Sequence, residues 1–194
     1  MKPETRISTD LRIEQRAGSN APRITGYAAV FNSETTIAGQ FREVIQPGAF
    51  KRALAEAQDC IACVNHNPDR IIGRTKSGTL ELREDNNGLW FSVEPPDTQE
   101  GRDLVTLMKR GDLSGTSFAF RATKDGETWE QKGSALPLRT LTDVDLFDVS
   151  IVTNGAYPDA GAALRSMATV INDAIKTSIE AKLAERLAKL NKNS

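Results

Sequence analysis

Cys60-Ile-Ala-Cys-Val-Asn-His66 is an apolar run that ends in the only histidine of the chain. A short and nearly continuous apolar run bounded by turn residues is typical of a buried β-strand. The polar stretch Asn67-Pro68-Asp69 follows at once and predicts a turn. We therefore expect the imidazole of His66 to emerge where a buried strand ends.

Two further strand patterns each carry a polar residue that could work with an imidazole. In Gly111-Asp-Leu-Ser-Gly-Thr-Ser117-Phe-Ala-Phe120 a serine stands near the start of the strand. In Leu146-Phe-Asp148-Val-Ser-Ile-Val-Thr153 one acid lies among apolar residues. A base, a hydroxyl and an acid on three strands are the groups that a serine hydrolase brings together. With one histidine in the chain, the candidate base is His66.

The nucleophile and the acid each have alternatives nearby. Ser114 stands three residues before Ser117 in the same glycine-rich loop. Asp143 and Asp145 precede Asp148. We prefer Asp148 because an acid within an apolar strand needs a polar partner.

The composition of the chain limits its class. The 194 residues are 39% hydrophobic and 26% charged, with a net charge of −1, which is typical of a soluble globular protein with a sizeable core. There is no basic field for a nucleic acid, no apolar run long enough for a membrane helix, and no apolar signal segment at the N-terminus. We expect a protein of the cytoplasm, with neither nucleic acid nor membrane as partner.

The cysteine pair Cys60-x-x-Cys63 has two functional interpretations that we consider unfavourable. A redox pair usually stands at a helix N-terminus, whereas here the two side chains would face opposite sides of a strand. A zinc site built with His66 would lack a fourth ligand, because the chain holds no second such motif. We expect two buried free thiols, no metal and no cofactor.

The rest of the pattern predicts mostly strands with flanking helices. The expected strands are Leu11–Glu14, Ile24–Phe31, Phe41–Ile45, Ile71–Thr75, Thr79–Arg83, Leu89–Val93 and Leu138–Thr142. Pro47–Ala57 and Asp97–Arg110 read as helices, the second with Asp97 as N-cap and Gly111 as its C-terminal stop. Residues 32–39 predict a loop, and residues 124–126 a hairpin turn.

The character of the chain changes at Ala160. From there to the polar end, Asn191–Ser194, apolar residues recur every three to five positions without proline, which predicts an amphipathic helical tail. We expect two regions, residues 1–159 as the main domain and residues 160–194 as this tail. The tail would either pack on the domain or bind a partner or a second copy.

An ordered set of short stretches resembles the prohead maturation proteases of tailed bacteriophages, which are similar in fold to the herpesvirus assemblins. Each stretch alone is weakly specific, but together they run from about Arg23 to Pro158. They include Gly26-Tyr-Ala-Ala-Val-Phe-Asn32, Glu43-Val-Ile-Gln-Pro-Gly-Ala-Phe50, Asn65-His-Asn-Pro-Asp69, Ile72-Gly-Arg-Thr75, Gly111–Phe120 and Phe147–Thr153.

This resemblance implies a fold and a set of site residues. The fold would be an assemblin-like β-barrel of mostly antiparallel strands ringed by helices. The family's histidine falls on His66, its serine on Ser117 and its acid on Asp148. Assemblins use a second histidine as the third member, which this chain lacks. As oxyanion-hole candidates we select the backbone amides of Asn154, Gly155 and Ala156, because a glycine lets the backbone approach a substrate closely.

The resemblance also implies a function. The protein would be a serine endopeptidase inside the prohead, in the cytoplasm of the bacterial host, that cleaves the scaffolding portion of the major capsid protein. Self-cleavage and a homodimer belong to the same expectation. The alternative is a non-enzymatic assembly protein that binds capsid or scaffold through its C-terminal helix.

Overall fold

The computed structural model describes residues 3–15, 21–131 and 135–153. Within these residues the chain forms thirteen strands and two helices, which confirms the expected mainly β class. The predicted helical tail and the boundary between residues 159 and 160 lie outside the described residues.

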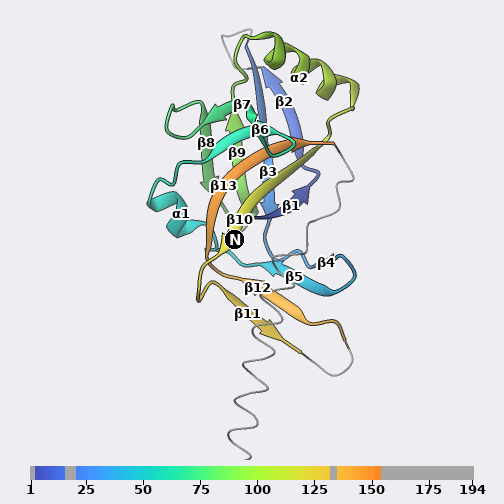
Figure 1. The fold of residues 1–194 in the computed structure, drawn as a ribbon, viewed down its shortest axis with the longest axis vertical. Helices are drawn as coiled ribbons and strands as arrows, with labels where there is room; N and C mark the ends of the chain where they lie inside the picture. Colours follow the sequence, from blue (N-terminus) through green and yellow to red (C-terminus); the bar gives the residue numbers. More distant parts are fainter. Residues whose placement is uncertain (1–2, 16–20, 132–134, 154–194) are drawn as a thin grey trace, which may run out of the picture. The chain divides into compact units, whose positions relative to one another are not determined.

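One five-stranded sheet contains Ser117 and Asp148, and His66 lies in the loop between two of its strands. Figure 1 shows the arrangement of these strands. The strands of this sheet, in spatial order, are β1 (Glu4–Ser8), β10 (Gly115–Ala122), β13 (Val144–Val152), β6 (Ile61–Val64) and β7 (Asn67–Arg74). Neighbouring strands are antiparallel except β13 and β6, which run parallel. Strand β13 therefore lies at the centre, between the strand of Ser117 and the strand that leads to His66.

Two four-stranded sheets complete the described β structure. One has the order β2 (Leu11–Gln15), β3 (Pro22–Val30), β9 (Gly88–Val93) and β8 (Leu80–Glu84). The other has the order β11 (Glu127–Glu130), β12 (Leu138–Leu141), β5 (Phe41–Ile45) and β4 (Thr35–Ile37). In Figure 1 this second sheet lies below the five-stranded sheet.

The expected closed barrel is not confirmed. A barrel closes only when its first and last strands pair, and in the described part of the chain each sheet ends in two edge strands. The sheets meet through side chains instead of a continuous ladder. Thr116 of β10, for example, donates its hydroxyl to the backbone carbonyl of Tyr27 in β3 at 3.0 Å. Phe118 of β10 packs edge-on against Phe50, which precedes α1, with ring centroids 5.6 Å apart.

A chain of aromatic rings fills the core beneath β10. Phe31 lies 6.0 Å from Phe50, and Phe118 lies 5.0 Å from Phe120, centroid to centroid. Successive side chains of a strand point to opposite faces. With Phe118 and Phe120 anchored in this core, Ser117 is directed to the opposite face of the sheet.

The two helices begin later than the sequence predicted. Helix α1 spans Lys51–Ala55. It starts after Gly48 because that residue has φ +99°, which is not a helical conformation. The Glu84 carboxylate accepts from the amides of Gly48 and Phe50 and so holds this turn before the helix. Helix α2 spans Gln99–Arg110 and is capped by Thr98, whose hydroxyl accepts from the Gly101 amide at 3.2 Å. The expected N-cap Asp97 instead pairs with Arg102. Gly111 does end α2, in the left-handed conformation.

Two local predictions from the sequence are wrong, and one strand was missed. Residues 32–39 contain the short edge strand β4, which pairs with β5. Residues 124–126 do not form a hairpin, because they connect β10 to β11 in another sheet. Strand β1 went unpredicted since its core-facing residues, Glu4 and Arg6, are charged and leave no apolar alternation.

Those charged residues belong to a buried ion cluster that joins β1, β5, β11 and β12. Arg6 donates to Glu4 and Glu43, and Arg139, 1% exposed, donates to Glu4, Glu43 and Glu127. Burial alone would lower the pKa of Arg139, but the hydrogen bond to Glu4 and the three negative charges outweigh it and raise that pKa. The cluster thus holds its guanidinium charged in the interior.

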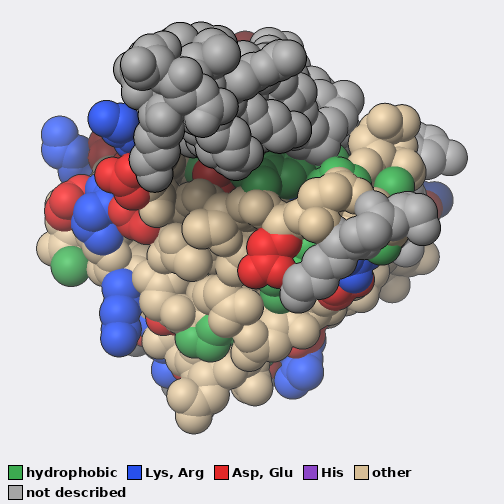
Figure 2. Space-filling view, turned by 90° about the horizontal axis from the view of Figure 1, so that it is seen from below, with side chains coloured by type: hydrophobic (Ala, Val, Ile, Leu, Met, Phe, Trp, Pro, Cys, Tyr) green, Lys and Arg blue, Asp and Glu red, His purple; other side chains and the backbone are tan. Residues whose placement is uncertain are grey.

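The surface carries mixed charge. On the face in Figure 2, acidic and basic side chains are interspersed. No helix within the described residues is long and apolar enough to cross a membrane.

Candidate active site

The pairing of the central strands brings His66, Ser117 and Asp148 together. Ser117 of β10 lies opposite Ser150 of β13, so Asp148, two residues earlier on β13, shares its face. Strand β6 runs parallel on the other side of β13 and ends just before His66. The histidine ring therefore reaches across β13 toward β10.

The three side chains form one hydrogen-bonded chain. His66 Nδ1 lies 2.7 Å from Asp148 Oδ1, and His66 Nε2 lies 2.7 Å from Ser117 Oγ. An ionised carboxylate can only accept hydrogen bonds, so Nδ1 carries the proton of the neutral ring. Nε2 then offers its lone pair to the Ser117 hydroxyl, which is the arrangement needed to remove the hydroxyl proton.

His66 occupies an unusual backbone position. Strands β6 and β7 form a hairpin in which Val64 pairs with Asn67, and the two loop residues, Asn65 and His66, have φ +53° and +54°. Positive φ at both loop residues is the pattern of a type I′ turn. The predicted turn at Asn67–Asp69 is thus two residues too late. Positive φ is uncommon for any residue other than glycine, although asparagine and histidine are enriched among the exceptions, and such a conformation persists where its surroundings hold it.

The candidate site is shielded but not closed. The side chain of His66 is 25% exposed and that of Asp148 is 14% exposed. Ser117 is 1% exposed and lies beneath the imidazole. Because little water reaches the site, the hydrogen bonds of His66 to Asp148 and to Ser117 are stronger than the same bonds would be in full contact with solvent.

The alternative residues lie elsewhere. Ser114 is exposed and precedes β10. Asp143 and Asp145 pair with Arg52 at 2.9 and 2.7 Å. The hydrogen bond from Arg52 is the main cause that lowers the pKa of Asp145. These two acids therefore form ion pairs with Arg52 of α1 and do not contact His66.

Sequence reasoning missed Ser150, which is fully buried beside the candidate triad. Its hydroxyl donates to Asp148 Oδ1 at 2.8 Å and accepts from the backbone amide of His66 at 3.1 Å. The signal was present, since Ser150 follows Asp148 by two residues and must share its face.

The two cysteines are buried and free, as expected. Burial is the main cause that raises the pKa of both thiols, that of Cys63 to about 11. Cys63 Sγ lies 3.0 Å from Ser150 Oγ. Among the described residues no group of three or more His, Cys, Asp and Glu is arranged to hold a metal ion.

The oxyanion-hole candidates Asn154, Gly155 and Ala156 lie outside the described residues. Thr153, the last residue before them, donates its amide to Asn65 Oδ1 at 3.3 Å. This bond ties the end of β13 to the turn that carries His66.

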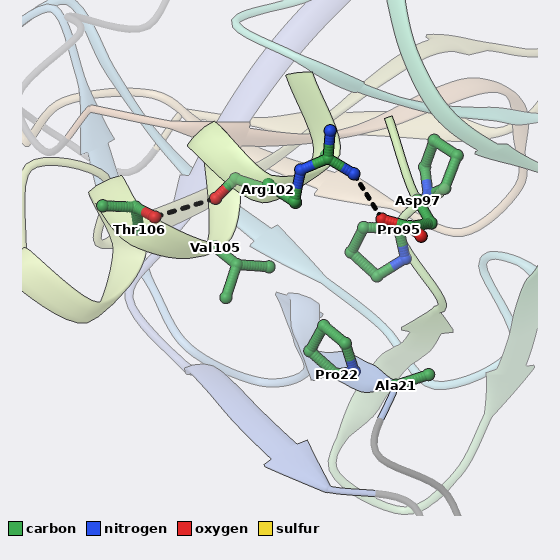
Figure 3. Close-up of a pocket in the computed structure, with 9 residues that line it drawn as sticks. Ala21, Pro22, Pro95, Asp97, Arg102, Val105 and Thr106 are labelled. Carbon is green, nitrogen blue, oxygen red and sulfur yellow. Dashed lines mark hydrogen bonds and ion pairs between the residues drawn. The ribbon is translucent and has the colours of Figure 1, made fainter. Parts of the chain in front are cut away.

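A cavity of about 590 Å³ lies apart from these residues (Figure 3). Prolines and the start of α2 line it, with Val105 and the Asp97–Arg102 pair at its wall. It contains neither a nucleophile with a neighbouring base nor any member of the candidate triad. We assign no chemistry to it.

A hydroxyl, an imidazole and a carboxylate bonded in this order are typical of serine hydrolases. The model of the caudovirus prohead serine protease family matches residues 8–173. The chain belongs to that family, and the family is one of serine proteases. A comparison with curated protein sequences found no significant match.

Among solved structures, the chain is similar to the bacteriophage T4 capsid assembly protease, gp21. The TM-score is 0.52 at 9% sequence identity, and the match covers 79% of this chain and 99% of the T4 chain. At this identity the likeness concerns the fold alone.

Proposed function

We propose that this protein is the endopeptidase that cleaves the scaffolding portion of the major capsid protein during prohead maturation. Ser117 is the nucleophile, His66 the general base and acid, and Asp148 the group that orients His66. The observation that supports these roles best is the imidazole bonded at 2.7 Å to a hydroxyl on one side and to a carboxylate on the other.

Acylation follows from this arrangement. Ser117 Oγ attacks the carbonyl carbon of the scissile bond while its proton passes to His66 Nε2. Asp148 stabilises the imidazolium that forms. When the tetrahedral intermediate collapses, the carbon–nitrogen bond breaks and His66 returns the proton to the leaving amine.

Deacylation repeats the sequence with water. The water attacks the ester carbon and gives a proton to His66, and the ester bond to Ser117 breaks as that proton returns to Oγ. We propose that backbone amides within residues 154–156 stabilise the oxyanion in both steps, since preorganised donors are worth most where charge develops.

Two findings support the substrate. The family is one of prohead proteases, and the similar T4 protein is a capsid assembly protease. The action we propose therefore takes place inside the prohead, in the host cytoplasm. Self-cleavage and a homodimer remain predictions.

Co-expression with the capsid protein of the same phage tests this function. The wild type should shorten the capsid protein, whereas Ser117→Ala should not, and intact mass spectrometry would locate the cut. Ser114→Ala is the matched control, because it removes an exposed hydroxyl just before β10, three residues from Ser117, and it should cut like the wild type. The mass of the protease in the same sample reports self-cleavage.

Two results would contradict the proposal. Shortening by both wild type and Ser117→Ala would exclude Ser117 as nucleophile. Proheads that form without shortening in either case would favour the non-enzymatic assembly protein.

A further inference from the structure

Ser150 occupies the point where the supports of the candidate triad converge. It lies opposite Ser117 on one side of β13 and opposite Cys63 on the other. Its hydroxyl contacts the carboxylate of Asp148, the backbone of His66 and the thiol of Cys63, at 2.8, 3.1 and 3.0 Å. Three polar partners around one buried hydroxyl show that Ser150 is an integral part of the hydrogen-bond network of the site.

The hydrogen-bonding capacity of this hydroxyl is fully used. A serine hydroxyl donates one hydrogen bond and accepts two. The donor goes to Asp148 Oδ1, and one acceptor position takes the His66 amide. Because the single hydrogen of the Ser150 hydroxyl goes to the Asp148 carboxylate, the Cys63 thiol is the donor to the second acceptor position. The direction of each bond is thereby set.

We propose that Ser150 is a positioning residue that aligns the acid and the base of the triad with each other. This inference rests on the proposed function and adds one residue to it. One hydroxyl holds the carboxylate that orients the imidazole and also the backbone from which that imidazole projects.

The need for such a support follows from the turn. His66 has φ +54°, a left-handed conformation that is strained for a residue other than glycine and persists only where its surroundings hold it. Without the Ser150 hydroxyl, the His66 amide would keep only the Cys63 sulfur as an acceptor, and Asp148 Oδ1 would lose one of its two donors. The ring would then sample orientations in which Nε2 no longer faces Ser117.

Steady-state kinetics of Ser150→Ala test the proposal, with a peptide that spans the mapped capsid cleavage site as substrate. We expect kcat to fall about 10- to 100-fold, as for the loss of a hydrogen bond to a charged group, with KM within about twofold. Ser92→Ala is the matched control, because Ser92 is also buried but lies on β9 in another sheet. It should leave kcat unchanged.

A second readout does not depend on proteolysis. The chain has one histidine, so selective ¹⁵N-histidine labelling gives NMR signals from a single imidazole. The wild type and Ser117→Ala should show the tautomer protonated on Nδ1, and Ser150→Ala should show a mixture of tautomers. If Ser150→Ala does not fold, Ser150→Cys in reducing buffer, which prevents a disulfide with the adjacent Cys63, supplies a much weaker donor and should show the same two losses.

The outcomes separate the two proposals. Unchanged kcat together with an unchanged tautomer in the Ser150 variants would overturn the positioning role. A wild type that cuts nothing, or a Ser117→Ala variant that still cuts, would overturn the proposed function, whereas the tautomer measurement would still decide the role of Ser150.

Discussion

Two buried polar clusters in this molecule differ in whether they keep a reactive group accessible. The ion cluster of Arg6 and Arg139 surrounds its guanidinium groups with three glutamates, and its central arginine is 1% exposed. In the candidate triad the imidazole is bonded on both sides, yet a quarter of the His66 side chain remains exposed. The first arrangement has no group free to react, whereas the second holds a hydroxyl beside a base.

The difference separates polar groups that hold the fold from polar groups that, in our proposal, perform chemistry. Both clusters join strands distant in the sequence, and both need their partners to offset the cost of burial. Substitutions should therefore divide cleanly, with loss of activity from one cluster and loss of stability from the other.

Asp148→Asn should have the largest effect. The amide can present its NH₂ group to Nδ1 and favour the wrong tautomer, so turnover should fall by roughly 10⁴. The folded structure should remain, so the free energy of unfolding should stay close to that of the wild type. Peptide cleavage and urea unfolding of the same preparation measure both. Full turnover would remove Asp148 from the triad.

Arg139→Met should show the reverse pattern. It leaves three buried carboxylates without their shared cation, and we expect a loss of about 3–5 kcal/mol in the free energy of unfolding. Turnover per folded molecule should stay within about twofold. Arg52→Met is the control. The Arg52 side chain also pairs with two aspartates, but it is 34% exposed, and an exposed ion pair contributes about 1 kcal/mol or less to stability. Equal losses in the two variants would undo the distinction.

The buried thiols should make stability depend on alkaline pH. Burial raises the pKa of Cys60 and Cys63, so on unfolding the thiols ionise at their ordinary value of 9.0. The free energy of unfolding is thus unaffected below about pH 9 and falls as the pH rises toward about 11, by about 1.4 kcal/mol per pH unit for each thiol. Cys60→Ala should have a shallower slope in that window. A slope equal to that of the wild type would contradict this account.

Asp145→Asn should have the smallest effect and serves as the partner experiment to Asp148→Asn. Since the Arg52 hydrogen bond lowers the pKa of Asp145, its contribution is present above the ordinary carboxyl pKa and is lost as the pH falls. At neutral pH we expect a loss of at most about 1 kcal/mol, because the side chain is 35% exposed. Turnover should match that of the wild type. Stability curves at neutral and acidic pH, with one activity assay, check both statements.

Secondary structure could be predicted well from the sequence where local signals decide it, that is, the alternation of apolar and polar residues and the turn residues. The strands β3, β5, β8, β9 and β12 lie where apolar patterns indicated them. His66, Ser117 and Asp148 could be selected because each is a polar residue set in an apolar strand or at its end. Their mutual distances follow from strand order, which the local pattern does not contain.

What could not be predicted depends on partners far along the chain. Glu4 and Arg6 lie at core positions because Arg139 and Glu43 meet them there, and no local rule favours charge in a buried strand. The left-handed turn at His66 likewise has a distant partner, because its amide donates to the hydroxyl of Ser150, which lies 84 residues further on.

The central place of β13 has a consequence for when the protein becomes active. Of the described strands it is the last to leave the ribosome, yet it separates β10 from β6 and carries Asp148. Until it inserts, the serine and histidine strands have no common neighbour and the imidazole has no carboxylate. Under the proposed mechanism, a nascent or partly unfolded chain is therefore proteolytically silent, and completion of the sheet itself switches the enzyme on.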